Sequence, residues 1–79
     1  MPRTTYDISE KMSEQLEKTF TYHAPKDDQP ERYVLLRDQA KELAYSIVKN
    51  TPPSREQSLA ITHLEAAIFC VNAAIARNE

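Results

Sequence analysis

Glycine is absent from this 79-residue sequence. Without glycine, neither a Walker phosphate loop nor a dinucleotide-binding fingerprint can be present, and glycine-dependent tight hairpins are excluded as well. Any nucleotide that the protein binds must therefore be held by side chains.

Cysteine and histidine are scarce. The single cysteine, Cys70, excludes an intrachain disulfide and fits a reducing compartment. Its apolar neighbours predict a buried small hydrophobe rather than a reactive thiol. His23 and His63 lie far apart and lack the spacing of metal ligands. We therefore expect no metal and no cofactor.

The net charge is small, and the apolar runs are short. Lysine and arginine total 10 and aspartate and glutamate total 12, a balance that argues against general DNA or RNA binding. No segment approaches the roughly 18 apolar residues of a membrane span, and the N-terminus lacks the apolar core of a signal peptide. We expect a soluble cytoplasmic protein without DNA or membrane partners.

The longest uninterrupted pattern is a helix over residues 54–77, with Ser54 as its cap and Gln57 as the reciprocal partner of a capping box. Helical spacing gives this segment a core stripe, formed by Leu59, Leu64, Ile68, Val71 and Ile75. A second apolar stripe lies beside it, formed by Ala60, Ile61, Phe69, Cys70, Ala73 and Ala76. Two stripes indicate a helix that is covered on more than one side.

A chain of this size buries a modest share of its surface and is often marginally stable alone. Because disulfide and metal are excluded, association of identical chains is the remaining way to stabilise it. The second apolar stripe provides the surface, so we expect a homo-oligomer.

The other elements complete an all-α fold. Residues 1–6 look frayed, and Asp7 with Glu10 predicts a capped short helix over 7–19. A second long helix is expected over 30–50, with Pro30 in its first turn. Its core stripe comprises Tyr33, Leu36, Ala40, Leu43, Ala44 and Ile47. The short turn at 51–53 then requires the two long helices to form an antiparallel hairpin.

An aromatic loop is predicted over residues 20–29, with Phe20, Tyr22 and His23 at its start. Because Pro25 favours an extended conformation in the residue before it, we expect Phe20 and Tyr22 on one side of an extended segment and His23 on the other. Both aromatics can plug the end of the hairpin, which the residue pattern alone favours, or form a binding surface.

Arg37 and Lys41 lie one helical turn apart and are neighbours on the surface. They form either a solvated edge paired with Asp38 or Glu42, or a dibasic clamp for phosphate. Their spacing does not decide between these alternatives.

No catalytic constellation is evident. Cys70 has no activating neighbour, and His63 and Glu65 point in different directions on a helix. Acidic residues near residue 30 are explained by helix capping. The sequence predicts a binding protein rather than an enzyme.

Several segments, in this order and spacing, resemble the phage anti-CBASS nucleotide-sponge family of short helical-hairpin proteins. They are the F-x-Y-H-x-P run, the LR-x-x-AK segment, S-R-E-x-SLA-x-T-x-LE-A and the closing N-A-A-I-A-R-N, which together cover about residues 20–79.

The resemblance implies a homohexamer that binds cyclic di- and trinucleotide second messengers, such as cyclic GMP-AMP, between protomers and holds them uncleaved in the host bacterial cytoplasm. It implies that Tyr22, with Phe20 and His23 of the same run, lines a base, and that Arg37 and Lys41 meet phosphates. Ser58 and Thr62 would add hydroxyl contacts. Arg77 would belong to a second class of pocket where three-fold-related chains meet.

Two other functional classes stay open. The first is an inhibitor or adaptor that engages a host protein through the aromatic segment and residues 54–77. The second is a nuclease-like or phosphodiesterase enzyme that degrades the messenger, which the lack of metal-ligand spacing and paired carboxylates disfavours.

Overall fold

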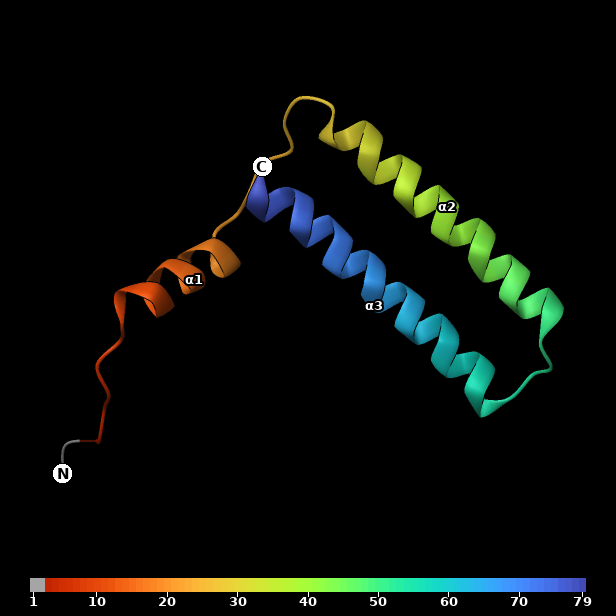
Figure 1. The fold of residues 1–79 in the computed structure, drawn as a ribbon, viewed down its shortest axis with the longest axis horizontal. Coiled ribbons are helices and arrows are strands. Elements are labelled where there is room, and N and C mark those ends of the chain that lie inside the picture. Colours follow the sequence, from red (N-terminus) through yellow and green to blue (C-terminus); the bar gives the residue numbers. More distant parts are fainter. Residues whose placement is uncertain (1–2) are drawn as a thin grey trace.

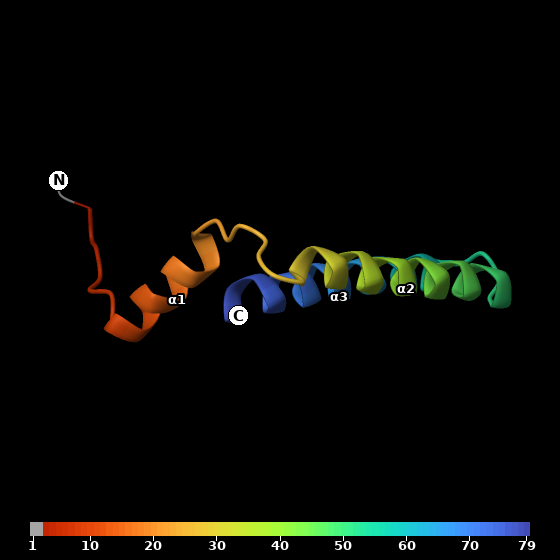
Figure 2. The same cartoon turned by 90° about the horizontal axis from the view of Figure 1, so that it is seen from above.

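The computed structural model describes residues 3–79, which form the helices α1 (Glu10–Phe20), α2 (Gln29–Asn50) and α3 (Arg55–Asn78), so the predicted all-α fold is confirmed. α2 and α3 lie side by side and antiparallel, whereas α1 stands apart near the open end of this hairpin (Figure 1). Seen from above, the hairpin is a single layer (Figure 2). Residues 1 and 2 of the expected frayed end lie outside the described range, and residues 3–9 are not helical.

The first helix begins later than predicted. Ser9, not Asp7, is its cap, because the Ser9 Oγ accepts the N–H of Met12 at 3.1 Å. A hydroxyl at this position satisfies a backbone donor that the first helical turn leaves free.

Side-chain hydrogen bonds stabilise the turn between the long helices. Ser54 caps α3 as predicted, with its Oγ accepting the N–H of Gln57 at 3.1 Å. The reciprocal bond of a capping box does not form. Instead, the Gln57 amide donates to the carbonyl oxygen and to the hydroxyl of Thr51, both at 3.0 Å. Gln57 thereby joins the end of α2 to the start of α3.

The two long helices meet along half-buried stripes that largely follow the predicted ones. The α2 stripe includes Tyr33, Leu36, Ala40, Ala44 and Ile47, and the α3 stripe includes Ile61, Leu64, Ile68, Val71 and Ile75. Three predicted burials are wrong, since Leu43, Leu59 and Cys70 are exposed. In a two-helix hairpin each helix covers one side of the other, and these three residues lie off that side.

No apolar residue in the described part of the chain is fully buried, and the buried residue there is Gln29, at 2% exposure. The radius of gyration is 18.3 Å, against about 12 Å for a compact domain of this length. Large apolar side chains, among them Tyr45 and Phe69, are more than half exposed. A single chain therefore has no core of its own.

α3 also departs from the expectation that no segment approaches a membrane span. By length and composition it is apolar enough to cross a membrane, with a mean hydropathy of 1.7 over its most apolar window. An apolar helix that is covered by protein has the same length and composition, so hydropathy does not distinguish the two environments.

Candidate functional site

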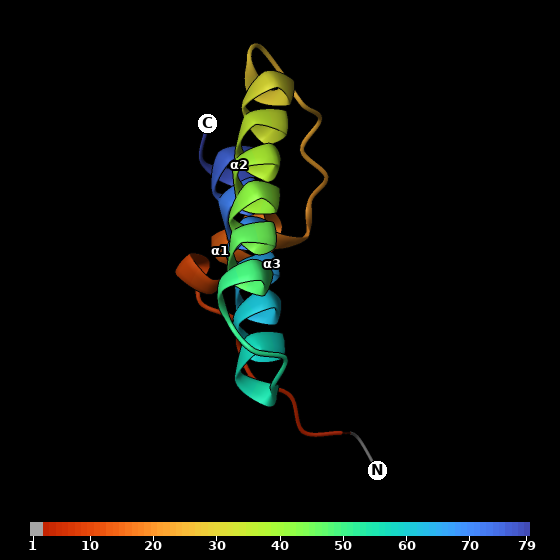
Figure 3. The ribbon, with the colours of Figure 1, turned by 90° about the vertical axis from the view of Figure 1, so that its right-hand side faces the viewer.

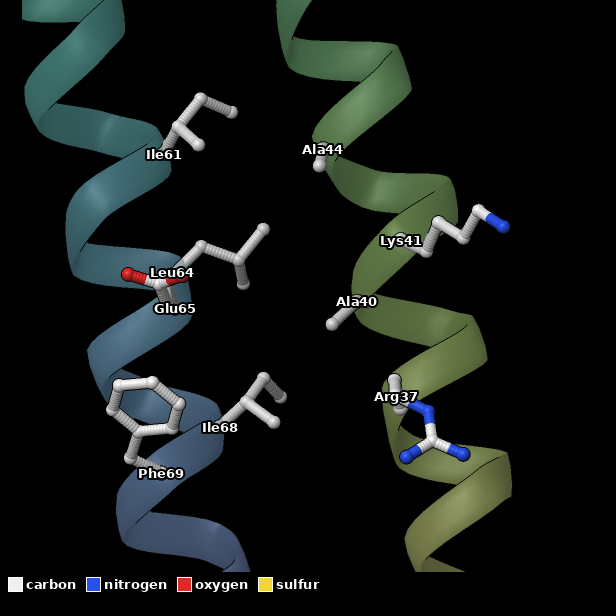
Figure 4. Close-up of a pocket in the computed structure, with 9 residues that line it drawn as sticks. All are labelled: Arg37, Ala40, Lys41, Ala44, Ile61, Leu64, Glu65, Ile68 and Phe69. Atoms are coloured by element: carbon white, nitrogen blue, oxygen red, sulfur yellow. The ribbon is translucent and has the colours of Figure 1, made fainter.

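A hollow of about 380 Å³ lies between α2 and α3 near the middle of the hairpin (Figure 4). We call it the seam groove. Its lining comprises Arg37, Ala40, Lys41 and Ala44 of α2, and Ile61, Leu64, Glu65, Ile68 and Phe69 of α3.

The groove exists because large side chains face small ones. Ile61, Leu64 and Ile68 point toward α2, where Ala40 and Ala44 leave room beside them (Figure 4). Beyond Ala44 and Ile61, a second hollow of about 220 Å³ adds Tyr45 and Val48 to the same wall. The floor is thus apolar, as in ligand sites that receive flat rings.

The predicted basic pair lies at this groove. Arg37 and Lys41 both line it, and Lys41 extends away from α3 (Figure 4). Across residues 3–79 neither side chain forms an ion pair, either with Asp38 and Glu42 or with Glu65 on the opposite wall. The structure therefore does not support the alternative in which Arg37 and Lys41 pair with neighbouring carboxylates on a solvated edge. Two cations remain available beside an apolar surface.

The predicted aromatic residues lie elsewhere. Phe20 ends α1 rather than beginning a loop, and Phe20 and Tyr22 are 81% and 84% exposed. The interpretation that they plug the end of the hairpin is wrong, because neither is covered by α2 or α3. His23 turns back instead, and its Nε2–H donates to the carbonyl oxygen of Lys18 at 2.9 Å. This bond ties the segment to the last turn of α1.

Ser58, Thr62 and Arg77 are exposed on α3 and do not line the groove. The Thr62 hydroxyl donates to the carbonyl oxygen of Ser58 at 3.1 Å, so it is engaged within its own helix. Helical spacing nevertheless places Ser58 and Thr62 on the same side of α3 as Phe69, nearer the turn. Arg77 lies in the last turn, far along α3 from them.

Sequence reasoning did not assign Glu65 and Phe69 to the site. Their spacing of four residues was visible, as was that of Ile61 and Glu65, and it places all three on one side of a helix. The missing information was which side of α3 forms a wall with Arg37 and Lys41. That depends on how the helices cross.

A second polar cluster closes the open end of the hairpin. We call it the Glu79 clasp, and it consists of Lys26, Gln29, Arg32 and Glu79. The Glu79 carboxylate accepts hydrogen bonds from both terminal nitrogens of Arg32, with the Nη1 bond at 2.7 Å, and from Gln29 Nε2 at 3.2 Å. Lys26 Nζ donates to the Glu79 backbone oxygen at 2.8 Å.

The Glu79 clasp alters the acidity of its members. Hydrogen bonds from Arg32, and then from Gln29, lower the pKa of Glu79 from 4.5 to about 2. The bond to Glu79 in turn raises the pKa of Arg32. Arg32 Nε also lies 3.2 Å from Asp28 Oδ1, as an ion pair without hydrogen-bond geometry.

This shift predicts a pH dependence of folding. The folded protein favours ionised Glu79, so the stabilisation is fully present above about pH 4.5, declines as the pH falls and is lost near pH 2. We expect the urea midpoint of Glu79→Gln to fall less than that of the wild type over this interval. Glu42→Gln is the control, since Glu42 has no ion pair within residues 3–79. Equal pH profiles for Glu79→Gln and the wild type would contradict the assignment.

The described residues thus form a helical hairpin without a core of its own, with an apolar groove beside two cations that make no ion pair within residues 3–79. In the family comparison, residues 12–76 match the Acb2/Tad1 hairpin domain. The match covers most of the chain, so the protein belongs to this family of anti-CBASS cyclic-nucleotide sponges, as the sequence resemblance predicted. No curated protein and no solved structure matches it.

Proposed function

We propose that this protein binds cyclic di- and trinucleotide second messengers and sequesters them uncleaved in the bacterial cytoplasm, so that CBASS effectors are not activated. Membership of the family supports an anti-CBASS role in general. The ligand assignment rests on the seam groove, where Arg37 and Lys41 lie beside an apolar wall and have no carboxylate partner within residues 3–79.

The chemistry of the ligand matches this arrangement. A cyclic dinucleotide carries two phosphate charges and two flat bases. Arginine and lysine are the side chains that bind phosphate, and apolar or aromatic surfaces accept the faces of bases. Phe69, which is 65% exposed at the groove, supplies such a surface from α3. A protein with net charge −2 suffices, because the positive charge is needed locally.

The complete pocket is proposed to lie between copies of the chain in a homohexamer. The seam groove of one chain is open, and no residue of the Phe20–His23 segment lines it. Tyr22 of a neighbouring copy would supply the second base-stacking face. Arg77, exposed in the last turn of α3, is proposed for a separate trinucleotide site where three copies meet.

Native mass spectrometry of the purified protein with a panel of cyclic di- and trinucleotides tests this proposal. We expect an oligomer that carries ligand, and release by denaturation should return the ligand intact. The wild type without ligand is the control for the mass of the assembly. Linear dinucleotides of the same composition test whether the cyclic form is required.

Other outcomes would redirect the assignment. Cleaved ligand would place the protein among messenger-degrading enzymes. A well-formed oligomer that carries no cyclic nucleotide would contradict the sponge proposal. It would favour the alternative of an inhibitor or adaptor that engages a host protein through its exposed apolar side chains.

A further inference from the structure

The Glu79 clasp joins parts of the chain that are distant in sequence. Glu79 follows directly after α3, whereas Lys26, Gln29 and Arg32 lie where the connection from α1 enters α2. In Figure 1 the end of α3 lies beside this connection, and Figure 3 shows the connection running along one side of the hairpin. The hydrogen bond between Lys26 Nζ and the Glu79 backbone oxygen links them directly.

Gln29 connects the Glu79 carboxylate to the backbone of the preceding turn through its side-chain amide. Its Nε2 donates to the Glu79 carboxylate, and this fixes its Oε1 where it accepts the N–H of Lys26 at 3.1 Å. The N–H of Gln29 donates to the carbonyl oxygen of Lys26 at 3.0 Å and closes a turn. Gln29 is 2% exposed. When the partner of a buried side-chain amide is removed, the amide keeps its desolvation cost without a hydrogen bond, and the folded state is destabilised.

The turn that Gln29 closes needs such support. Asp27 within it adopts φ 51°, a left-handed conformation that costs about 1–2 kcal/mol for residues with a Cβ. Glycine would adopt it without strain, and the sequence contains none. Aspartate tolerates it better than most residues, but the turn still depends on the hydrogen bonds around it.

The segment between α1 and α2 is held by hydrogen bonds at both of its ends. His23 bonds to the Lys18 carbonyl oxygen of α1, and Lys26 is held by the clasp. Ala24 and Pro25 therefore lie between two anchored points, and Pro25 has a restricted backbone. This short connection links Tyr22 and α1 to the hairpin.

From these contacts we infer that Glu79 is a positioning residue, which latches the Thr21–Asp28 segment, and with it Tyr22, to the open end of the hairpin. Glu79 does not touch the seam groove. Its effect on cyclic-nucleotide binding rests on the proposed function. The latch itself is independent of any ligand.

Hydrogen–deuterium exchange without ligand tests the latch. In Glu79→Gln we expect the Lys26 and Gln29 amides to exchange about tenfold faster than in the wild type, while amides in the middle of α2 and α3 exchange at unchanged rates. Glu56→Gln is the matched control, because it removes the same charge from the first turn of α3. Arg32→Gln should reproduce the effect. The double variant should add little to either single one, since the two residues act as a pair.

The affinity for a cyclic dinucleotide, taken from the panel above, separates the two proposals. If Glu79→Gln exchanges faster and also binds more weakly than Glu56→Gln, both are supported. If the wild type binds no cyclic nucleotide but the exchange difference is present, the proposed function fails and the latch stands. Equal exchange at Lys26 and Gln29 in Glu79→Gln and the wild type would overturn the latch, whatever the affinities.

Discussion

Arg37→Ala is expected to weaken cyclic dinucleotide binding by about 10- to 100-fold, because a hydrogen bond to a charged group contributes about 1.5–3 kcal/mol. Arg37 lines the seam groove and has no ion-pair partner within residues 3–79, so its removal should leave the hairpin folded. Isothermal titration calorimetry measures the affinity, and circular dichroism checks the helices.

Lys49→Ala is the matched control, since it removes a positive charge from the last turn of α2 without touching the groove. It should bind nearly as the wild type does. Equal losses in Arg37→Ala and Lys49→Ala would mean that net charge, not a phosphate contact, governs binding. An unchanged affinity in Arg37→Ala would remove the seam groove from the site.

Tyr22 offers a second measurement on the same pocket. Tyr22→Ala should lower affinity roughly 5- to 100-fold if the ring stacks on a base, since such stacking contributes about 1–3 kcal/mol. Tyr22→Phe keeps the ring face and should retain most of the affinity. A loss in both variants would assign the contact to the phenol hydroxyl instead.

Tyr45→Asp is expected to abolish the proposed oligomer at micromolar concentration. Tyr45 is 61% exposed in the single chain. Burial of a large apolar side chain contributes about 1.5–3 kcal/mol, and a symmetric assembly loses this in every copy. A carboxylate buried at the same place adds a desolvation cost. Analytical ultracentrifugation over a concentration series gives the mass of the assembly.

Ser46→Asp introduces the same side chain at the adjacent, exposed polar position and should assemble normally. Because the chain lacks a core of its own, the dissociated Tyr45→Asp protein should also have a lower melting temperature, whereas the melting temperature of the assembled wild type should rise with its concentration. A wild type that is monomeric and stable would contradict this account. A wild type that is recovered only in detergent or lipid would assign the exposed apolar surface of α3 to a membrane.

The sequence alone determined the helices and their connection. Helical spacing of apolar residues, the Ser54 cap and the proline-containing turn predicted an antiparallel hairpin, and the structure has it. These signals are local, because each depends on residues within one or two turns of each other. The order of short motifs over about residues 20–79 also indicated the family, and the match over residues 12–76 confirms it.

Tertiary structure decided which sides of these helices meet. Leu43, Leu59 and Cys70 belong to apolar stripes, yet they are exposed because one neighbouring helix covers only part of a helix surface. The same crossing places Glu65 and Phe69 in one groove lining with Arg37, and neither Arg37 nor Lys41 forms an ion pair within residues 3–79. The Glu79 clasp joins residues about fifty positions apart. No local pattern specifies such a contact, because it exists only once both long helices have formed and folded back on each other.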